Sequence, residues 1–256
     1  MTAERRVIVH PDKASLAASV AARFVTKLLD LLDERPVVHL ALTGGSMGGA
    51  VLAAVADSPA RASIDWDRVH FWWGDERWLP AGDPERNDRQ SRDALLDALQ
   101  TPESQIHAFP AADAGIGLDE AAEAYAAELA RFGTGSQPFP TFDITFLGVG
   151  PDGHIASLFP HRSAIQVSDR TVVPVRNSPK PPPERLSLTR PVLNASDRIW
   201  LVLAGADKAS ALGLALAGAS RDEVPVAGIK GRRRTVFFID REAAAEVPES
   251  LIAPDL

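Results

Sequence analysis

The sequence reads FDITFLGVGPDGH from Phe142 to His154. Its first half is almost continuously apolar and rich in aromatic and branched residues, which is typical of a strand buried on both faces. Three glycines and a proline then follow within six residues and end the strand abruptly, because they supply permissive backbone in place of side chains. Strands buried on both faces belong to parallel sheets that helices cover, so this stretch predicts an α/β protein.

The rest of the chain alternates apolar runs with segments of helical spacing. The predicted strands are Val7–His10, Val37–Leu42, Asp67–Trp73, Ile106–Phe109, Phe142–Leu147, Arg170–Val175, Arg198–Ala204 and Val236–Asp240. The predicted helices are Ala14–Leu32, Ala50–Ala56, Ser91–Leu99, Leu118–Arg131 and Ala209–Leu216, and a short helical segment is expected after His154. This alternation predicts a doubly wound, mainly parallel sheet with helices on both faces, in a single domain of residues 1–256.

The composition argues against several classes of protein. A net charge of -7 argues against nucleic acid as the main partner, since duplex binding requires a basic face. The absence of cysteine excludes disulfides, thiolate metal sites and cysteine nucleophiles, and it suits a reducing cytoplasm. The N-terminus, MTAERRV, lacks the apolar segment of a secretory signal, and no apolar run approaches the length of a membrane span. We therefore expect a cytoplasmic protein that binds neither nucleic acid nor membranes.

Four of the predicted strands end in loops of small or charged residues. These loops are Thr43–Gly49, Gly74–Arg77, Gly150–His154 and Gly205–Lys208. The carboxyl ends of parallel strands meet at one edge of a sheet, and ligands bind at that edge in open α/β sheets. The convergence of the four loops predicts a catalytic cleft for a small anionic substrate.

The glycine-rich loop Thr43–Gly49 stands between a buried strand and a helix. In this geometry backbone N–H groups and a helix N-terminus cradle a phosphate, and Thr43 and Ser46 add hydroxyl donors. The loop lacks the lysine of a P-loop and the glycine spacing of a dinucleotide site, which argues against a nucleotide cofactor. The alternative is a plain strand–helix turn that needs small residues.

Asp152 and His154 lie two residues apart at the end of the central strand. Imidazole titrates near neutral pH and a carboxylate can hold its tautomer, so the pair is a candidate acid–base centre. The alternative is a tight turn whose histidine caps a helix. Lys208 opens a helix, where the dipole disfavours a cation unless an anion is nearby, so it is a further candidate for the site.

Two other segments have roles that the sequence leaves open. Asp75 and Arg77 directly follow an aromatic strand, and they either serve the cleft or tie down their loop as an ion pair. Asn87, in the polar segment beyond them, faces either the cleft or solvent. The prolines of residues 177–189 enforce an extended backbone, which suits either a rigid linker or a loop that covers a pocket.

In these motifs the chain resembles the 6-phosphogluconolactonase family. That family shares the fold of glucosamine-6-phosphate isomerase/deaminase and is related in architecture to ribose-5-phosphate isomerase. The resemblance rests on LTGGS at 42–46, WGDERWLP at 73–80, GVGPDGHIASLFP at 148–160, SPKPPPER at 178–185 and GADKA at 205–209. With the flanking strands it extends over most of the chain.

The resemblance implies hydrolysis of 6-phospho-D-glucono-1,5-lactone to 6-phosphogluconate in the oxidative pentose phosphate pathway, without a redox cofactor. We expect a monomer with no bound metal, in which His154 takes a proton from water and Asp152 orients the imidazole. Arg77 is expected near the carbonyl or the phosphate, with Asp75 holding Arg77 or a sugar hydroxyl. The residues expected at the 6-phosphate are Thr43, Gly44, Gly45, Ser46, Lys208 and Arg185.

Two alternatives remain. The first is an aldose–ketose isomerase or deaminase of the same fold, with Asp75 as the enolising base. That branch carries a glutamate five residues after the motif histidine, where this chain has Phe159, so the lactonase is favoured. The second is a non-catalytic sugar-phosphate sensor, which would keep the phosphate loop without using the acid–base pair.

One departure from the family is Met47-Gly48, where many relatives carry a small residue and proline.

Overall fold

The computed structural model describes residues 4–252, so residues 1–3 and 253–256 of the expected domain lie outside the described part. Its centre is a six-stranded sheet in the order β1-β9-β8-β5-β2-β3, and all neighbouring strands in it are parallel. The strands are β1 (Glu4–His10), β2 (Val38–Leu42), β3 (Val69–Trp73), β5 (Ile144–Leu147), β8 (Arg198–Leu203) and β9 (Arg234–Asp240). The predicted parallel sheet is confirmed.

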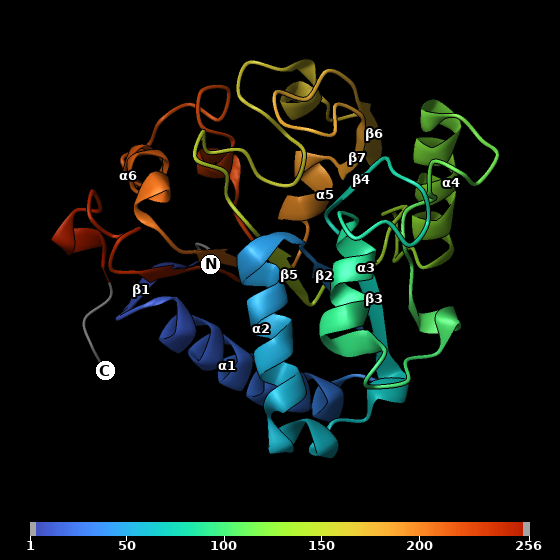
Figure 1. Cartoon of the computed structure of the whole chain (residues 1–256), viewed down its shortest axis with the longest axis horizontal. Coiled ribbons are helices and arrows are strands. Elements are labelled where there is room, and N and C mark those ends of the chain that lie inside the picture. The colour runs from blue at the N-terminus through green and yellow to red at the C-terminus, as the bar shows by residue number, and fades with distance from the viewer. Residues whose placement is uncertain (1–3, 253–256) are drawn as a thin grey trace.

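Helices cover both faces of this sheet, as the sequence predicts (Figure 1). The helices α1 (Lys13–Glu34) and α2 (Gly45–Asp57) lie on one face, and α5 (Arg190–Asn194) and α6 (Ala209–Leu216) lie on the other. All four residues of the central strand β5 are buried, because a helix-covered parallel sheet leaves neither face to solvent.

The direction of chain winding reverses between β2 and β5. From β1 the chain moves through β2 to β3 at one edge of the sheet, whereas from β5 it moves through β8 to β9 in the opposite direction. Right-handed crossovers therefore put the connecting helices of the two halves on opposite faces. The connections leaving β2 and β5 diverge at this point, and the resulting crevice is where open α/β sheets bind ligands.

A second, antiparallel sheet lies beside the first and was not predicted. It consists of β4 (Asp75–Arg77), β7 (Arg185–Leu188) and β6 (Val172–Val175), in that order. The predicted strand Arg170–Val175 is present as β6, in this second sheet rather than in the parallel one, and Asp75–Arg77 is a strand rather than a loop. The pairing depends on residues far apart in the chain, such as Asp75 with Ser187, so local pattern could not reveal it.

Several predicted helix boundaries also differ. α2 begins at Gly45 rather than after the glycines. Residue 48 must be a glycine, because a side-chain Cβ there would lie 2.3 Å from the carbonyl oxygen of Thr43. α2 packs against α1, and this tertiary packing overrides the low helix propensity of its glycines. α3 (Asn87–Ser91) continues into a π-helical turn (Arg92–Leu96), so the helix predicted from Ser91 starts earlier. α4 is Leu118–Arg131, as predicted.

Two predicted elements are missing from the described residues. Ile106–Phe109 is no strand and contributes a single bridge between Ile106 and Phe71. Tight turns rather than a helix follow His154. The remaining helical pieces are single 3₁₀ turns, at Pro59–Ser63, Trp66–Arg68, Glu103–Gln105, Ser163–Gln166, Ala206–Lys208, Pro225–Gly228 and Glu249–Leu251. Within residues 4–252, no helix has both the length and the apolar character needed to cross a bilayer.

Three histidines gather beside β2 and β3, away from the carboxyl ends of the strands. Nδ1 of His70 lies 2.8 Å from Nε2 of His107, whose Nδ1 lies 2.8 Å from Oε1 of Glu128. Nδ1 of His39 accepts a hydrogen bond of 3.1 Å from Trp72. Burial lowers the pKa of all three rings, and burial together with the charges of the other two lowers the pKa of His39 to about 3.

We expect acid to destabilise the protein through His39. In the unfolded chain this ring is protonated near its ordinary pKa of about 6.5, whereas in the folded protein it is protonated only near pH 3. The free energy of unfolding therefore decreases as the pH falls from about 6.5 to about 3. His39→Gln keeps an acceptor for Trp72 and cannot titrate. Its urea midpoint should fall less than that of the wild type between about pH 7 and pH 4.5. Identical pH dependence in both proteins would refute the assignment.

Candidate active site

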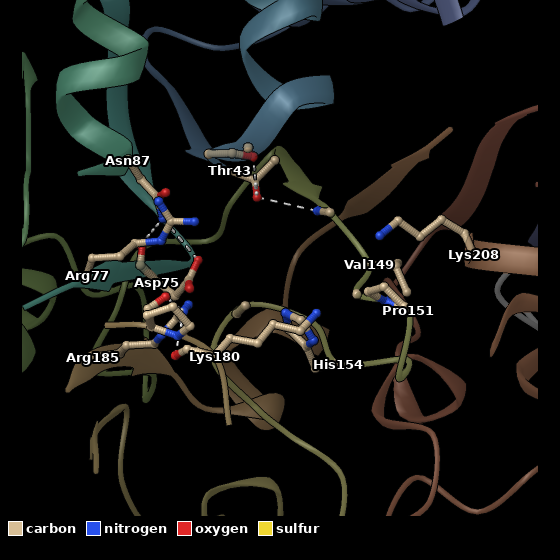
Figure 2. Close-up of a pocket in the computed structure, with 16 residues that line it drawn as sticks. Thr43, Asp75, Arg77, Asn87, Val149, Pro151, His154, Lys180, Arg185 and Lys208 are labelled. Carbon is tan, nitrogen blue, oxygen red and sulfur yellow. Dashed lines mark hydrogen bonds between the residues drawn. The ribbon is translucent and has the colours of Figure 1, made fainter. Parts of the chain in front are cut away.

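A cavity of about 450 Å³ opens at the carboxyl ends of the strands, where the winding reverses (Figure 2). Each of the four predicted loops lines it, through Thr43, Asp75, Gly150 and Lys208 among others. In Figure 2 Asp75, Arg77 and Asn87 lie on one side of the cavity and Lys208 on the other. All the predicted site residues line it except Ser46 and Asp152.

His154 is presented by a tight turn at the end of β5. The N–H of Gly150 donates to the carbonyl of His154 at 2.9 Å, and the N–H of Gly153 donates to the carbonyl of Gly150 at 2.9 Å. Gly153 has φ +78°, a conformation that side chains rarely adopt, so glycine suits this corner. The ring of His154 packs on the buried ring of Phe159, with the centroids 4.5 Å apart. The turn and the aromatic contact together fix the imidazole.

Asp152 lies outside the cavity lining and holds the imidazole from behind. Its Oδ1 is 2.5 Å from Nδ1 of His154. Burial opposes ionisation of this carboxyl, but the hydrogen bond and charge of His154, with the charge of Lys180, outweigh it and lower the pKa of Asp152 to about 2. An ionised carboxylate accepts a hydrogen bond from Nδ1–H. The neutral imidazole therefore carries its free lone pair on Nε2.

At two positions of the site only glycine fits, because functional side chains occupy the space where a Cβ would lie. A Cβ on Gly150 would lie 2.0 Å from Nδ1 of His154 and 2.5 Å from Oδ1 of Asp152. A Cβ on Gly44 would lie 1.9 Å from Oδ1 of Asn87. These distances are far shorter than a contact between non-bonded atoms. The two glycines therefore allow His154, Asp152 and Asn87 to pack closely against the backbone.

The opposite end of the cavity carries the donors expected for a phosphate. Gly44 is the N-cap of α2 and Gly45 its first residue, and the hydroxyl of Thr43 lies beside them. The N–H of Gly45 donates to Oε1 of Gln90 at 3.0 Å. Lys208 precedes α6 and pairs with Asp207 at 2.9 Å, while most of its side chain is enclosed. Ser46 is exposed and does not line the cavity, because α2 has already begun at Gly45 and turns that side chain outward.

Asp75 and Arg77 do not form an ion pair with each other; each has other hydrogen-bond partners. Oδ2 of Asp75 accepts a hydrogen bond of 2.7 Å from Ser157, and its Oδ1 accepts one of 3.2 Å from Asn87. Arg77 donates through Nη1 to the carbonyl of Glu85, and its Nε has no hydrogen-bond partner among the described residues. Asp75 is thus a fixed acceptor at the cavity wall, and Arg77 keeps donor capacity for a ligand.

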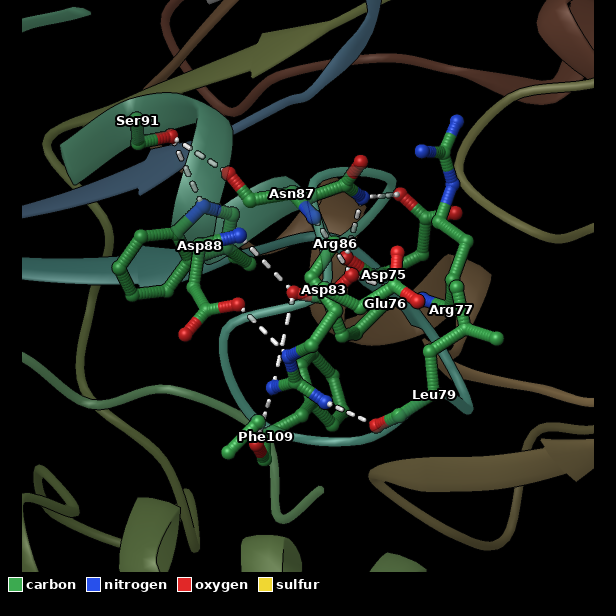
Figure 3. Close-up of polar contacts among 12 residues, drawn as sticks. Asp75, Glu76, Arg77, Leu79, Asp83, Arg86, Asn87, Asp88, Ser91 and Phe109 are labelled. Atoms are coloured by element: carbon green, nitrogen blue, oxygen red, sulfur yellow. Dashed lines mark hydrogen bonds and ion pairs between the residues drawn. The ribbon is translucent and has the colours of Figure 1, made fainter. Parts of the chain in front are cut away.

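Glu76 braces this wall from beneath, a role that the sequence did not reveal (Figure 3). Its carboxylate accepts the backbone N–H groups of Arg77 at 2.8 Å, Asn87 at 2.7 Å and Asp88 at 2.9 Å. Burial raises the pKa of Glu76, and the Arg86 charge and these N–H groups act in the opposite direction. The available signal was its place between Asp75 and Arg77 in the WGDERWLP motif.

Arg185 holds the proline-rich segment rather than projecting freely into the cavity. Its guanidinium donates to the carbonyls of Lys180 at 3.2 Å, Pro181 at 2.8 Å and Pro182 at 3.2 Å. Lys180 and Pro181 line the cavity beside it. Of the two alternatives for the proline-rich segment, a rigid linker or a loop that covers a pocket, the structure therefore favours the second. Lys180 and Asn87 are cavity residues that the predicted site did not include.

Known proteins resemble this chain closely. A family model described as glucosamine-6-phosphate isomerases/6-phosphogluconolactonase matches residues 11–238. A 6-phosphogluconolactonase of Streptomyces coelicolor is 48% identical, and the match covers 97% of each chain. The solved structure of a 6-phosphogluconolactonase from Thermotoga maritima matches with a TM-score of 0.80 at 25% identity, over 93% of this chain and 100% of that one. A monomeric glucosamine-6-phosphate deaminase, 22% identical, shares the fold with a TM-score of 0.77 over 94% and 99% of the two chains.

Proposed function

The chain belongs to the glucosamine-6-phosphate isomerase/6-phosphogluconolactonase family, and we propose that it hydrolyses its lactone with a water molecule that His154 activates. The reaction converts 6-phospho-D-glucono-1,5-lactone into 6-phospho-D-gluconate, in the pentose phosphate pathway. One observation carries the mechanism: the imidazole is held by a carboxylate on one of its nitrogens and faces a cavity whose far end is cationic and rich in N–H donors.

The chemistry begins at Nε2 of His154. This nitrogen takes a proton from water while the water oxygen forms a bond to the lactone carbonyl carbon, and Asp152 stabilises the imidazolium that results. The negative charge that develops on the carbonyl oxygen requires a positioned donor, for which Arg77 is the candidate. The carbon–ring oxygen bond then breaks and the ring oxygen takes the proton back from Nε2. The product is an open-chain acid, which ionises to the carboxylate.

The remaining polar groups orient the substrate. The N–H group of Gly44, the Thr43 hydroxyl and the Lys208 ammonium are suited to the 6-phosphate, because a helix N-terminus and a cation both favour an anion. The N–H of Gly45 joins them if a phosphate replaces Gln90 as its acceptor. Asp75 accepts hydrogen bonds from Ser157 and Asn87 at the cavity wall and is suited to a sugar hydroxyl. Arg185 acts on the substrate chiefly by holding the proline-rich cover in place.

Phe159 favours the lactonase over the deaminase. It stands where the resemblance places a proton-transferring glutamate in the deaminase branch, and it is a buried ring packed on His154. A phenyl group carries no proton, so ring opening and enolisation lack a participant here. Incubation with glucosamine 6-phosphate should release no ammonia.

The direct test is a lactonase assay on freshly generated 6-phosphogluconolactone, corrected for spontaneous opening. Turnover above the spontaneous rate, with none of the deaminase activity, supports the proposal. Tight binding of 6-phosphogluconate without turnover would favour a non-catalytic sensor instead, and would overturn it.

Replacing Lys208 with alanine should raise KM for the phosphorylated lactone about 10- to 100-fold, because a charge-assisted bond to a phosphate is worth roughly 1.5–3 kcal/mol. Unphosphorylated glucono-1,5-lactone provides the matched control, since it lacks the group that Lys208 binds. An equal loss of kcat/KM on both lactones would contradict the assignment of Lys208 to the phosphate.

We also propose that the protein acts as a monomer in the cytoplasm. The described cavity draws its acid–base pair, cations and N–H donors from one chain, so a partner is not needed to complete it. A phosphorylated sugar does not cross membranes unaided, which requires the enzyme to share a compartment with the source of its substrate.

A further inference from the structure

The proline-rich segment beside the cavity is held in one conformation around Lys180. The N–H of Ser178 donates to the carbonyl of Pro183 at 2.9 Å, and the hydroxyl of Ser178 donates to the carbonyl of Lys180 at 2.8 Å. Arg185, only 5% exposed, donates to three consecutive carbonyls of the segment, those of residues 180–182. Its guanidinium carbon lies 5.6 Å from the Phe159 ring centroid. Arg185 therefore links the backbone that carries Lys180 to the aromatic ring on which His154 packs.

Lys180 reaches from this segment toward the acid–base pair. Its Nζ lies 3.9 Å from Oδ1 of Asp152, the same oxygen that is 2.5 Å from Nδ1 of His154. The distance is that of an ion pair rather than of a hydrogen bond, so the lysine acts on the carboxylate through its charge. One carboxylate oxygen thus stands between an ammonium and an imidazole.

This arrangement bears on the protonation of His154. A carboxylate favours the charged imidazolium, and a protonated ring cannot act as a base. A second cation on the same oxygen offsets that attraction. Resting on the proposed function, we propose that Lys180 is a positioning residue for the hydrolysis: its ammonium pairs with the carboxylate that holds His154 and so favours the unprotonated ring, whose Nε2 takes the proton from water.

The other charges that face Lys180 do not replace it. Lys208 has its own partner in Asp207 at 2.9 Å, and Arg185 is engaged with the carbonyls of the segment. Partial burial, together with the charges of Lys208 and Arg185, lowers the pKa of Lys180, and the carboxylates of Asp152 and Asp207 act in the opposite direction. Lys180 is the cation paired with Asp152 among the described residues.

The decisive experiment is an NMR titration of the His154 ring without substrate, with its signals assigned by comparison with His154→Gln. In Lys180→Met, which keeps the apolar stem and removes the charge, the pKa of His154 should rise by roughly 0.5–1 unit. Lys180→Arg should restore most of the difference. Lys27→Met is the matched control, because it removes an equivalent Lys–Asp pair on α1, where Nζ lies 2.5 Å from Asp30.

The same shift should appear in the kinetics. The acidic limb of the kcat/KM profile should move to higher pH by the same amount in Lys180→Met, so that the loss is larger at about pH 6 than at about pH 8. Arg185→Lys loosens the segment and should move the acidic limb of the kcat/KM profile in the same direction when Lys180 is present. In the Lys180→Met background the same substitution should not move the limb, because the charge that it displaces is already absent.

An unchanged His154 titration in Lys180→Met overturns the proposal. A rise in KM at every pH with the limb unmoved also overturns it, since Lys180 would then merely contact the substrate anion. Failure of the proposed function itself would appear differently, as an absence of lactone turnover in the wild type, and the NMR titration does not depend on turnover.

Discussion

Replacing His154 with glutamine should lower kcat about 10²- to 10⁴-fold, the range over which a positioned general base accelerates a reaction. Glutamine fills much of the same space on Phe159 and retains polar atoms, but it cannot take a proton from water. Initial-rate measurements on fresh lactone, corrected for spontaneous hydrolysis, give kcat directly. The loss should be specific to turnover, because the phosphate end of the cavity lies across from the imidazole.

Binding of 6-phosphogluconate separates a chemical role from a structural one. Calorimetry should find the product bound by His154→Gln within a few-fold of its wild-type affinity, because the variant removes no donor to the phosphate. If affinity falls as far as kcat, His154 supports the shape of the cavity and the general-base mechanism is wrong.

Gly150→Ala should be almost as damaging as removal of the imidazole. The new methyl would lie 2.0 Å from Nδ1 and 2.1 Å from Cε1 of His154, so the ring must leave Asp152 or the turn must open. Either movement displaces the base, and displacement of about 1 Å costs on the order of 10²-fold in rate. We expect kcat to fall by at least that factor while the phosphate site still binds.

Two comparisons keep this result interpretable. Gly49→Ala adds the same methyl in α2, where no atom lies within 4 Å of it, and should leave kcat near the wild-type value. In the His154→Gln background, Gly150→Ala should add little further loss, because residues that act as one unit are not additive. Full additivity, or an unfolded Gly150→Ala protein by circular dichroism, would show that the glycine serves the fold rather than the base.

Much of the fold was predictable because it depends on local pattern. A buried parallel strand is apolar along its whole length and a covering helix is apolar every third or fourth residue, and both patterns are present in segments such as Phe142–Leu147 and Ala14–Leu32. Glycine-rich strand ends are equally local. The geometry of parallel sheets then brings those ends together without any knowledge of long-range contacts.

The predictions that were wrong concern contacts between distant segments. The strand at Arg170–Val175 was predicted, but the second sheet that it joins was not, because β6 pairs with β7, and β7 pairs with β4 across more than a hundred residues, as Asp75 with Ser187 shows. The start of α2 was misplaced because glycine disfavours helix locally, whereas the packing of α2 against α1 stabilises it.

The sequence by itself therefore determined the parallel α/β architecture, the edge of the sheet that carries the cavity and most of the residues that line it, because each follows from short-range periodicity and the fixed direction of parallel strands. Only the tertiary structure decided what each residue does there. It brought Lys180 to Asp152, set Glu76 beneath Asn87 and turned Arg185 onto the backbone of the proline-rich segment. Such contacts join residues of separate elements or depend on the direction of a side chain, and neither is encoded in local pattern.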